Sequence, residues 1–151
     1  MTDIVRVISE SAIEHIRSKP EMYLPAGASS VGTKLVGLLL VDSLALGIHD
    51  VQIVRNKDWY AIAADSDWLR RGKYALNIVD LFDRLVPLPE AGINSIRHEV
   101  VVAAFACDVL TSVQDETVIV KSSDDKNALA DGLALCNRLL PMRAVAFRCP
   151  L

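Results

Sequence analysis

The side chains that could bind a metal ion or act as nucleophile and base are few and scattered along this chain. Cysteine and histidine are typical zinc ligands, and histidine is also the most common general base. The three histidines and three cysteines lack the close pairing of a zinc site: His15, His49, His98, Cys107, Cys136 and Cys149. No nucleophile, base and orienting acid form a recognisable set. The sequence therefore predicts neither a metal site nor catalytic residues.

The composition indicates one domain spanning residues 1–151. The chain is 52% hydrophobic, enough for one core, and its 151 residues are too few for two comfortable domains. A formal net charge of −3 without a dense Lys/Arg run argues against direct binding of nucleic acid. The N-terminus lacks a signal-peptide pattern, and no apolar run approaches the ~18 residues that span a bilayer. We therefore expect a cytoplasmic protein without membrane association.

Two helices are predicted before residue 50. Ser11 and Glu14 form a capping box, and Pro20 ends the helix that this box begins. Residues 34–46 are apolar nearly all round, with Thr33 as a plausible N-cap and Gly47 as the C-terminal stop. A helix that is apolar on all sides is buried. This segment is therefore predicted to be the central helix.

The rest of the chain predicts hairpins and helices without regular alternation. Strands are expected at residues 51–55, 60–64, 111–113, 117–121 and 142–148, and helices at residues 75–85, at 96–110 and after Asp124 or Asp125. This order is typical of an α+β fold. We expect a two-layer α/β sandwich with helices on one face of a mixed, mostly antiparallel sheet.

The end of the first predicted helix carries a motif shared with a known family. Its residues read R-x-K-P-x-M-Y, namely Arg17, Lys19, Pro20, Met22 and Tyr23. The motif resembles the opening of the ATPase domain of DNA gyrase B and topoisomerase IV, in the GHKL superfamily. The predicted order of elements along nearly the whole chain is also similar to that domain. The resemblance implies the gyrase B-type, or Bergerat, ATPase fold, with Tyr23 near the mouth of a nucleotide site.

The resemblance also implies that the catalytic residues on the central helix have been replaced. In the family, this helix carries a glutamate that activates the attacking water and, four residues later, an asparagine that binds magnesium, so that both share one helix face. The matching positions are Leu39 and Ser43, while Asp42 matches the acidic residue that precedes the asparagine. Leucine cannot accept a proton, and serine is a weak substitute for the amide. Hydrolysis by the family mechanism is therefore expected to be absent.

The family motif Asp-Gly-x-Gly is altered as well. It supplies a carboxylate to the adenine amino group, and its glycines let the backbone approach the base. This chain has Asp65-Ser66-Asp67-Trp68 in that place. Asp65 either keeps the carboxylate role or is a solvated residue at a strand end. Trp68 places an indole where the family has a glycine.

The third family motif is a glycine-rich lid that runs into the N-terminus of a helix, where free N–H groups hold the phosphates. His98 matches the histidine of this motif, but Glu99 and Val101 stand where glycines are expected. Glu99 would place a negative charge near a triphosphate. The segment before His98 is also shorter than the family's lid.

These replacements predict a degenerate, non-hydrolysing pseudo-ATPase domain that serves as a protein-interaction or regulatory module. The expected partner is another protein or a second copy of the chain, and no cofactor is expected. The alternative is a reduced adenine-nucleotide-binding protein that holds ATP and magnesium through Asp42 and Asp65. Under the first hypothesis Leu39, Trp68 and Val101 fill the space that a nucleotide needs. Under the second, an open pocket faces Asp65.

Overall fold

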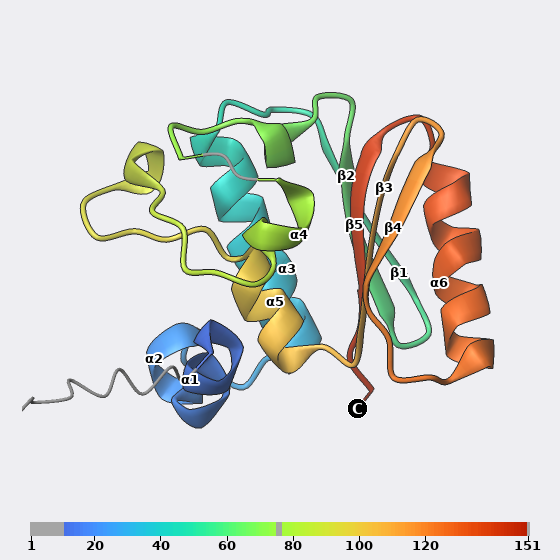
Figure 1. Cartoon of the computed structure of the whole chain (residues 1–151), viewed down its shortest axis with the longest axis horizontal. Coiled ribbons are helices and arrows are strands. Elements are labelled where there is room, and N and C mark those ends of the chain that lie inside the picture. Colours follow the sequence, from blue (N-terminus) through green and yellow to red (C-terminus); the bar gives the residue numbers. More distant parts are fainter. Residues whose placement is uncertain (1–10, 75–76, 151) are drawn as a thin grey trace, which may run out of the picture.

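A computed structural model describes residues 11–74 and 77–150, and a five-stranded sheet forms its centre (Figure 1). The strands are β1 (Val51–Asn56), β2 (Trp59–Ala64), β3 (Asp108–Val113), β4 (Glu116–Lys121) and β5 (Arg143–Arg148). They lie in the order β1-β2-β5-β3-β4. The hairpins β1–β2 and β3–β4 flank β5, which pairs with both. All these pairings are antiparallel, so the described sheet is antiparallel throughout rather than mixed.

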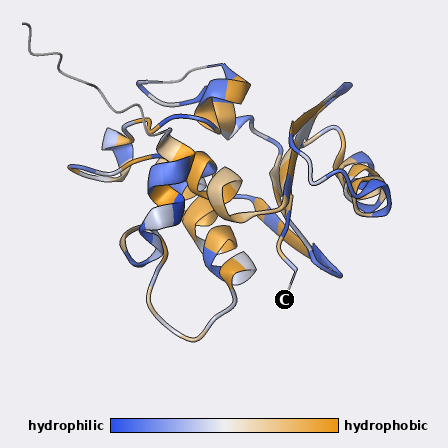
Figure 2. Ribbon diagram, turned by 60° about the horizontal axis from the view of Figure 1, so that its bottom comes forward, coloured by the Kyte–Doolittle hydropathy of each residue, from blue (hydrophilic) through white to orange (hydrophobic). Residues whose placement is uncertain are grey.

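Helices cover both faces of the sheet. The helices α3 (Val31–Ala45), α4 (Ile78–Leu81) and α5 (Glu99–Phe105) lie on one side, and α6 (Lys126–Leu139) lies on the other (Figure 1). The short helices α1 (Ala12–Ser18) and α2 (Pro20–Tyr23) precede α3, and α1 packs against α5. Much of α3 is hydrophobic, while α6 has a polar outer side (Figure 2). The expected α+β sandwich is thus confirmed in its general form.

The expectation that all helices lie on one face of the sheet is wrong, and β2 shows why. Every residue of β2 is buried. Its alternate residues Tyr60 and Ile62 belong to the large core cluster under α3 and α5, whereas Trp59 and Ala61 belong to a second cluster with α6. A strand covered on both faces is apolar continuously rather than alternately. Two apolar faces require two helical layers, and α6 provides the second.

Close packing fixes α6 on the sheet. A Cβ atom added at Gly132 would lie 2.4 Å from ring atoms of Trp59, so only glycine allows the helix to approach the indole. The indole N–H of Trp59 donates to the carbonyl of Ala128 at 3.1 Å. Asp125 caps the helix, because its carboxylate accepts the N–H of Ala128 at 3.1 Å. Asp125 was one of the two predicted caps.

The cap predictions for the first two helices are met in part. Ser11 accepts the N–H of Glu14 at 3.1 Å, and α1 ends at Ser18, so that only Lys19 separates it from Pro20, the first residue of α2. The central helix α3 begins three residues earlier than expected, because Ser30 rather than Thr33 is its N-cap. Gly47, with a φ of +88°, follows the end of α3 as predicted.

Two predicted helices are much shorter in the structure. Of the segment 75–85, only α4 is helical among the described residues, and Ala75 and Leu76 lie outside them. Of the segment 96–110, only α5 is helical, and β3 already begins at Asp108. Because α5 and β3 are both buried, the sequence through them is continuously apolar. Its hydrophobic periodicity therefore does not show where the helix ends and the strand begins. Within residues 11–74 and 77–150, no helix combines the length and apolar character needed to cross a membrane.

Candidate functional site

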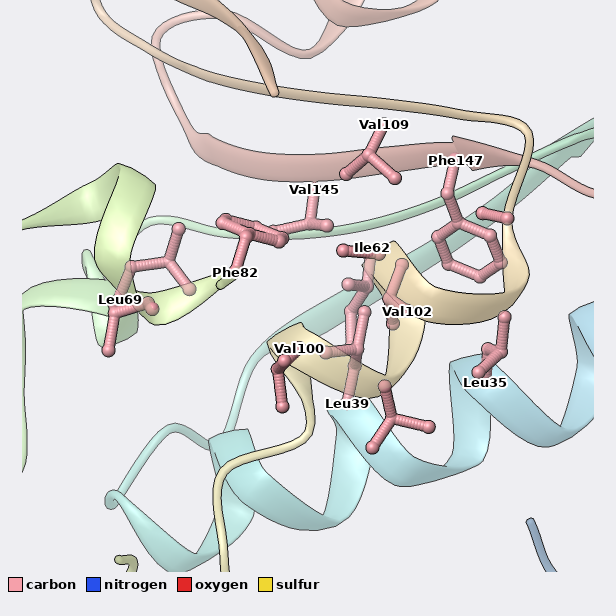
Figure 3. Packing of buried hydrophobic residues seen from close by; sticks show 14 of the residues in the cluster. Leu35, Leu39, Ile62, Leu69, Phe82, Val100, Val102, Val109, Val145 and Phe147 are labelled. Atoms are coloured by element: carbon pink, nitrogen blue, oxygen red, sulfur yellow. The ribbon is translucent and has the colours of Figure 1, made fainter. Parts of the chain in front are cut away.

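Three of the residues singled out in the sequence lie in the main core. Leu39, Trp68 and Val101 each have an exposed fraction of 0% and belong to the cluster between the helices and the sheet. Leu39 points from α3 toward the sheet, near Ile62 and Val100 (Figure 3). Protein interiors are close-packed, with few voids larger than a water molecule. The space around these positions is therefore filled by apolar side chains.

Asp42, on the buried side of α3, binds His98 through both carboxylate oxygens. One oxygen accepts the backbone N–H of His98 at 2.6 Å, and the other lies 2.8 Å from the ring Nδ1. The tautomer of the imidazole with its proton on Nδ1 can donate to this oxygen. Asp42 has an exposed fraction of 0%. It therefore ties the central helix to the residue that precedes α5 and holds the imidazole in one orientation.

Beside this pair lies a buried ion pair between Arg97 and Glu99. Nε of Arg97 donates to Oε1 of Glu99 at 2.6 Å. The same guanidinium donates to the carbonyl of Arg71 at 2.6 Å and to that of Trp68 at 3.2 Å. Exposed fractions are 1% for the Arg97 side chain and 0% for that of Glu99. Arg97 thus fastens the segment around Trp68 to the start of α5.

The carboxyl group of Glu99 ionises less readily than an exposed one. Burial raises its pKa from 4.5 to about 7; Asp42 adds to the rise, while the positive charge of Arg97 opposes it. Its second oxygen, Oε2, is buried and accepts no hydrogen bond from any described residue. An unpartnered oxygen in the interior disfavours the charged form. The charge of this buried pair therefore depends on pH near neutrality.

Ser43 is directed into its own helix. Its hydroxyl donates to the carbonyl of Leu40 at 2.8 Å, and the residue is fully buried. This is the local bond that serines inside helices often make with the preceding turn. Across residues 11–74 and 77–150, no group of three or more His, Cys, Asp or Glu side chains is placed to hold a metal ion.

In the segment after β2, Asp67 rather than Asp65 forms an ion pair with the rest of the fold. Asp67 receives two hydrogen bonds from the guanidinium of Arg143, at 2.8 Å and 2.9 Å, and Arg143 also donates to Thr111 at 3.0 Å. Burial opposes ionisation of Asp67, but the contacts with Arg143 outweigh it and lower the pKa of Asp67. Asp65 is exposed and lines a cavity near the β3–β4 turn. The retained carboxylate therefore lies at the surface.

A cavity of about 460 Å³ adjoins the Asp42–His98 pair. Met22 and Tyr23 of α2, Val41 and Asp42 of α3, and His98 line it together with Leu85, Ala91, Asn94, Ser95 and Ile96. Asp65 does not line this cavity, so the structure does not bring Asp42 and Asp65 to one site. A second surface hollow shares the wall formed by Leu85 and residues 94–96.

The R-x-K-P-x-M-Y motif connects α1, α2 and this cavity. Nε of Arg17 donates to the carbonyl of Ala104 at 2.7 Å. Lys19 lies between the two helices, and Pro20 occupies the first turn of α2, where its missing N–H costs no bond. Met22, with an exposed fraction of 65%, and Tyr23 then reach the cavity. The motif thus places two side chains at the cavity wall.

The geometry allows His98 to bind a ligand but gives it no nucleophile to activate. Asp42 orients the imidazole as the acid of a catalytic triad does. In the described part of the chain, however, the imidazole of His98 has a hydrogen-bond contact only with Asp42. A nucleophile and its base normally lie within hydrogen-bond reach of each other. The site as built is a polar patch on an apolar cavity wall.

Sequence reasoning missed the arginines that organise this region. Arg97 and Arg143 have exposed fractions of 1% and 2%, and each fastens the segment after β2 to another part of the fold. One signal was present in each case: Arg97 stands two residues from Glu99, and Arg143 opens an apolar strand. Charged residues are rarely buried unless paired. Charges inside apolar segments therefore indicated buried pairs.

Comparison of the chain with protein-family models, with curated proteins and with solved structures gives no match.

Proposed function

We propose that this chain is a non-hydrolysing domain of the gyrase B-like ATPase type that serves as a protein-interaction module. The observation that carries the proposal is the burial of Leu39, Trp68 and Val101 in one core. The neighbouring polar groups engage one another, Asp42 with His98 and Arg97 with Glu99. A nucleotide site needs the reverse: open space and unpaired donors aimed at phosphate.

The alternative, adenine-nucleotide binding through Asp42 and Asp65, has less support. Both carboxylate oxygens of Asp42 are in contact with His98, and Asp65 lines a different cavity. Trp68 occupies the position at which the family motif has a glycine near the adenine, and it is fully buried. The negative charge of Asp42 would also repel a triphosphate.

The proposed docking surface is an apolar rim around the cavity and its neighbouring hollow. We define this rim by five exposed side chains that line the two hollows, Met22, Val41, Tyr74, Leu85 and Ile93. Ile93 alone has an exposed fraction of 94%. Contiguous exposed apolar patches mark protein interaction sites. Because the rim consists of apolar side chains, the partner segment that fits is apolar rather than charged.

The absence of nucleotide chemistry is tested by titrating the protein with a non-hydrolysable ATP analogue and magnesium in a calorimeter, and by measuring phosphate release from ATP. We expect neither binding in the micromolar range nor turnover above the protein-free rate. An active gyrase-type ATPase domain run in parallel confirms that both assays work. Micromolar binding together with phosphate release would overturn the proposal.

The interaction surface is tested by placing a photo-crosslinking amino acid at Ile93 or Met22 in the native cell. Both positions are expected to give the same adduct, and its mass distinguishes another protein from a second copy of this chain. Lys57, an exposed residue of the β1–β2 turn, is the control position. The Met22→Asp substitution should abolish the Ile93 adduct, because burying a charge in an apolar contact is costly. Identical products at Ile93 and Lys57 would show that the rim is not a docking surface.

A further inference from the structure

A separate cavity of about 310 Å³ lies between α1, α4, α5 and β4. Four apolar side chains, Ile13, Val79, Phe82 and Val120, form its walls, together with the cations Arg17 and Lys121. None of its lining residues belongs to the cavity beside His98. Ligand sites are typically concave and mostly apolar, with a few placed polar groups.

The two cations are held in place by the last carbonyls of α5. Nε of Arg17 donates to Ala104 at 2.7 Å. Nζ of Lys121 donates to Ala103 at 2.9 Å and to Ala106 at 2.7 Å. Cations are favoured at helix C-termini, where the carbonyls lack partners within the helix. These contacts fix both side chains beside the apolar walls.

Each cation keeps unused donors. A guanidinium has five N–H groups and an ammonium has three, so the contacts with α5 leave both terminal nitrogens of Arg17 and one proton of Lys121. Neither residue forms an ion pair with any acid in the described ranges, including Asp83, which lines the same cavity. Burial and then the positive charge of Arg17 lower the pKa of Lys121. The cavity thus holds two neighbouring positive groups that form no ion pair with a described residue, and the carboxylate of Asp83 is also in its lining.

We propose that this cavity binds a small carboxylic acid with an apolar tail. The carboxylate lies between the terminal nitrogens of Arg17 and the ammonium of Lys121, and the tail packs among Ile13, Phe82 and Val120. The planar guanidinium fork matches a carboxylate with two parallel hydrogen bonds. A volume near the lower end of the ~300–1,000 Å³ range of ligand pockets restricts the ligand to a small molecule. This site does not depend on the function proposed for the rim.

The proposal is tested with octanoate and the full chain, by calorimetry and by NMR of the methyl groups of Ile13, Val79 and Val120. Octanoate is expected to bind and to shift these three residues. Octanamide has the same tail without the charge. Its affinity should be lower by a factor of about ten or more, as expected for loss of charged hydrogen bonds. Arg17→Gln should weaken octanoate by a similar factor. The matched control is Arg138→Gln, at an exposed position on α6, and it should leave the affinity unchanged.

Several outcomes would overturn the proposal. These are no octanoate binding at millimolar concentration, equal binding of octanoate and octanamide, or an unchanged affinity in Arg17→Gln. Inorganic phosphate that competes fully with octanoate and shifts the same methyl groups would show a general anion site instead. Because Lys121 caps α5, Lys121→Met is interpreted only together with Arg17→Gln and a thermal melt. If both variants fold, both must bind octanoate about tenfold more weakly than the unaltered chain.

Discussion

Replacing Leu39 with glutamate is expected to destabilise the domain by roughly 3–5 kcal/mol and to produce no ATPase activity. The substitution restores the residue type that the family uses as its general base. Leu39, however, has an exposed fraction of 0% and packs against the sheet. A carboxylate at this depth would lie among the apolar side chains of the core, and burial of an unpaired charge is among the most damaging of substitutions.

The effect is measured by chemical denaturation at neutral pH, together with phosphate release from ATP. Leu39→Met is the matched control, because a volume-conserving apolar replacement usually costs less than about 1.5 kcal/mol. If Leu39→Glu remained as stable as Leu39→Met, the side chain would have to reach water, and the filled core described around α3 would be incorrect.

Replacing Arg97 with methionine is expected to cost about 3–5 kcal/mol, because it leaves Glu99 buried without its counterion. Arg97 also donates to the carbonyls of Arg71 and Trp68, which would lose these partners. Removing both charges, in Arg97→Met with Glu99→Leu, should recover part of the loss. A double variant no more stable than Arg97→Met would show that the unpaired charge of Glu99 is not the source of the loss.

The same pair predicts a dependence on pH. The pKa of Glu99 in the folded state is raised from 4.5 to about 7. Between these values the folded protein binds more protons than the unfolded chain, so the free energy of unfolding falls as pH rises through this window. Glu99→Gln should flatten that slope. In Arg97→Met the loss should be smaller at about pH 5, where Glu99 is neutral, than at about pH 8. Denaturation curves at the two pH values measure this difference.

The elements were predictable where local signals are strong. Ser11 capping Glu14, the stop at Gly47 and the hairpin around Lys57 follow from short-range chemistry, and the structure confirms each. The side of the sheet on which α6 lies was not predictable in this way. It depends on the contact of Gly132 with Trp59. These residues lie far apart in the sequence, and no local pattern connects them. The gyrase B-type fold itself stays a prediction.

The sequence allowed individual residues of the candidate site to be singled out, but it did not show which residues contact each other. Leu39, Trp68 and Val101 are apolar and lie buried in the core, as apolar residues usually do. The pairing of Asp42 with His98 joins residues 56 positions apart, and the pairing of Asp67 with Arg143 joins residues 76 apart. Partners at such separations are selected by tertiary packing, and a single sequence does not record them. Asp65, singled out for adenine, instead lies exposed beside Asp67.

The position of β5 has a consequence for how this protein is made. β5 is the last strand along the described chain, yet it lies in the middle of the sheet and separates two hairpins that do not pair with each other. A ribosome delivers β1 to β4 first, so β2 and β3 must wait with unpaired inner edges until residues 143–148 emerge. Such edges are sites of aggregation. Folding of the sheet is therefore completed only after β5 has been synthesised, and until then β2 and β3 each expose an unpaired edge.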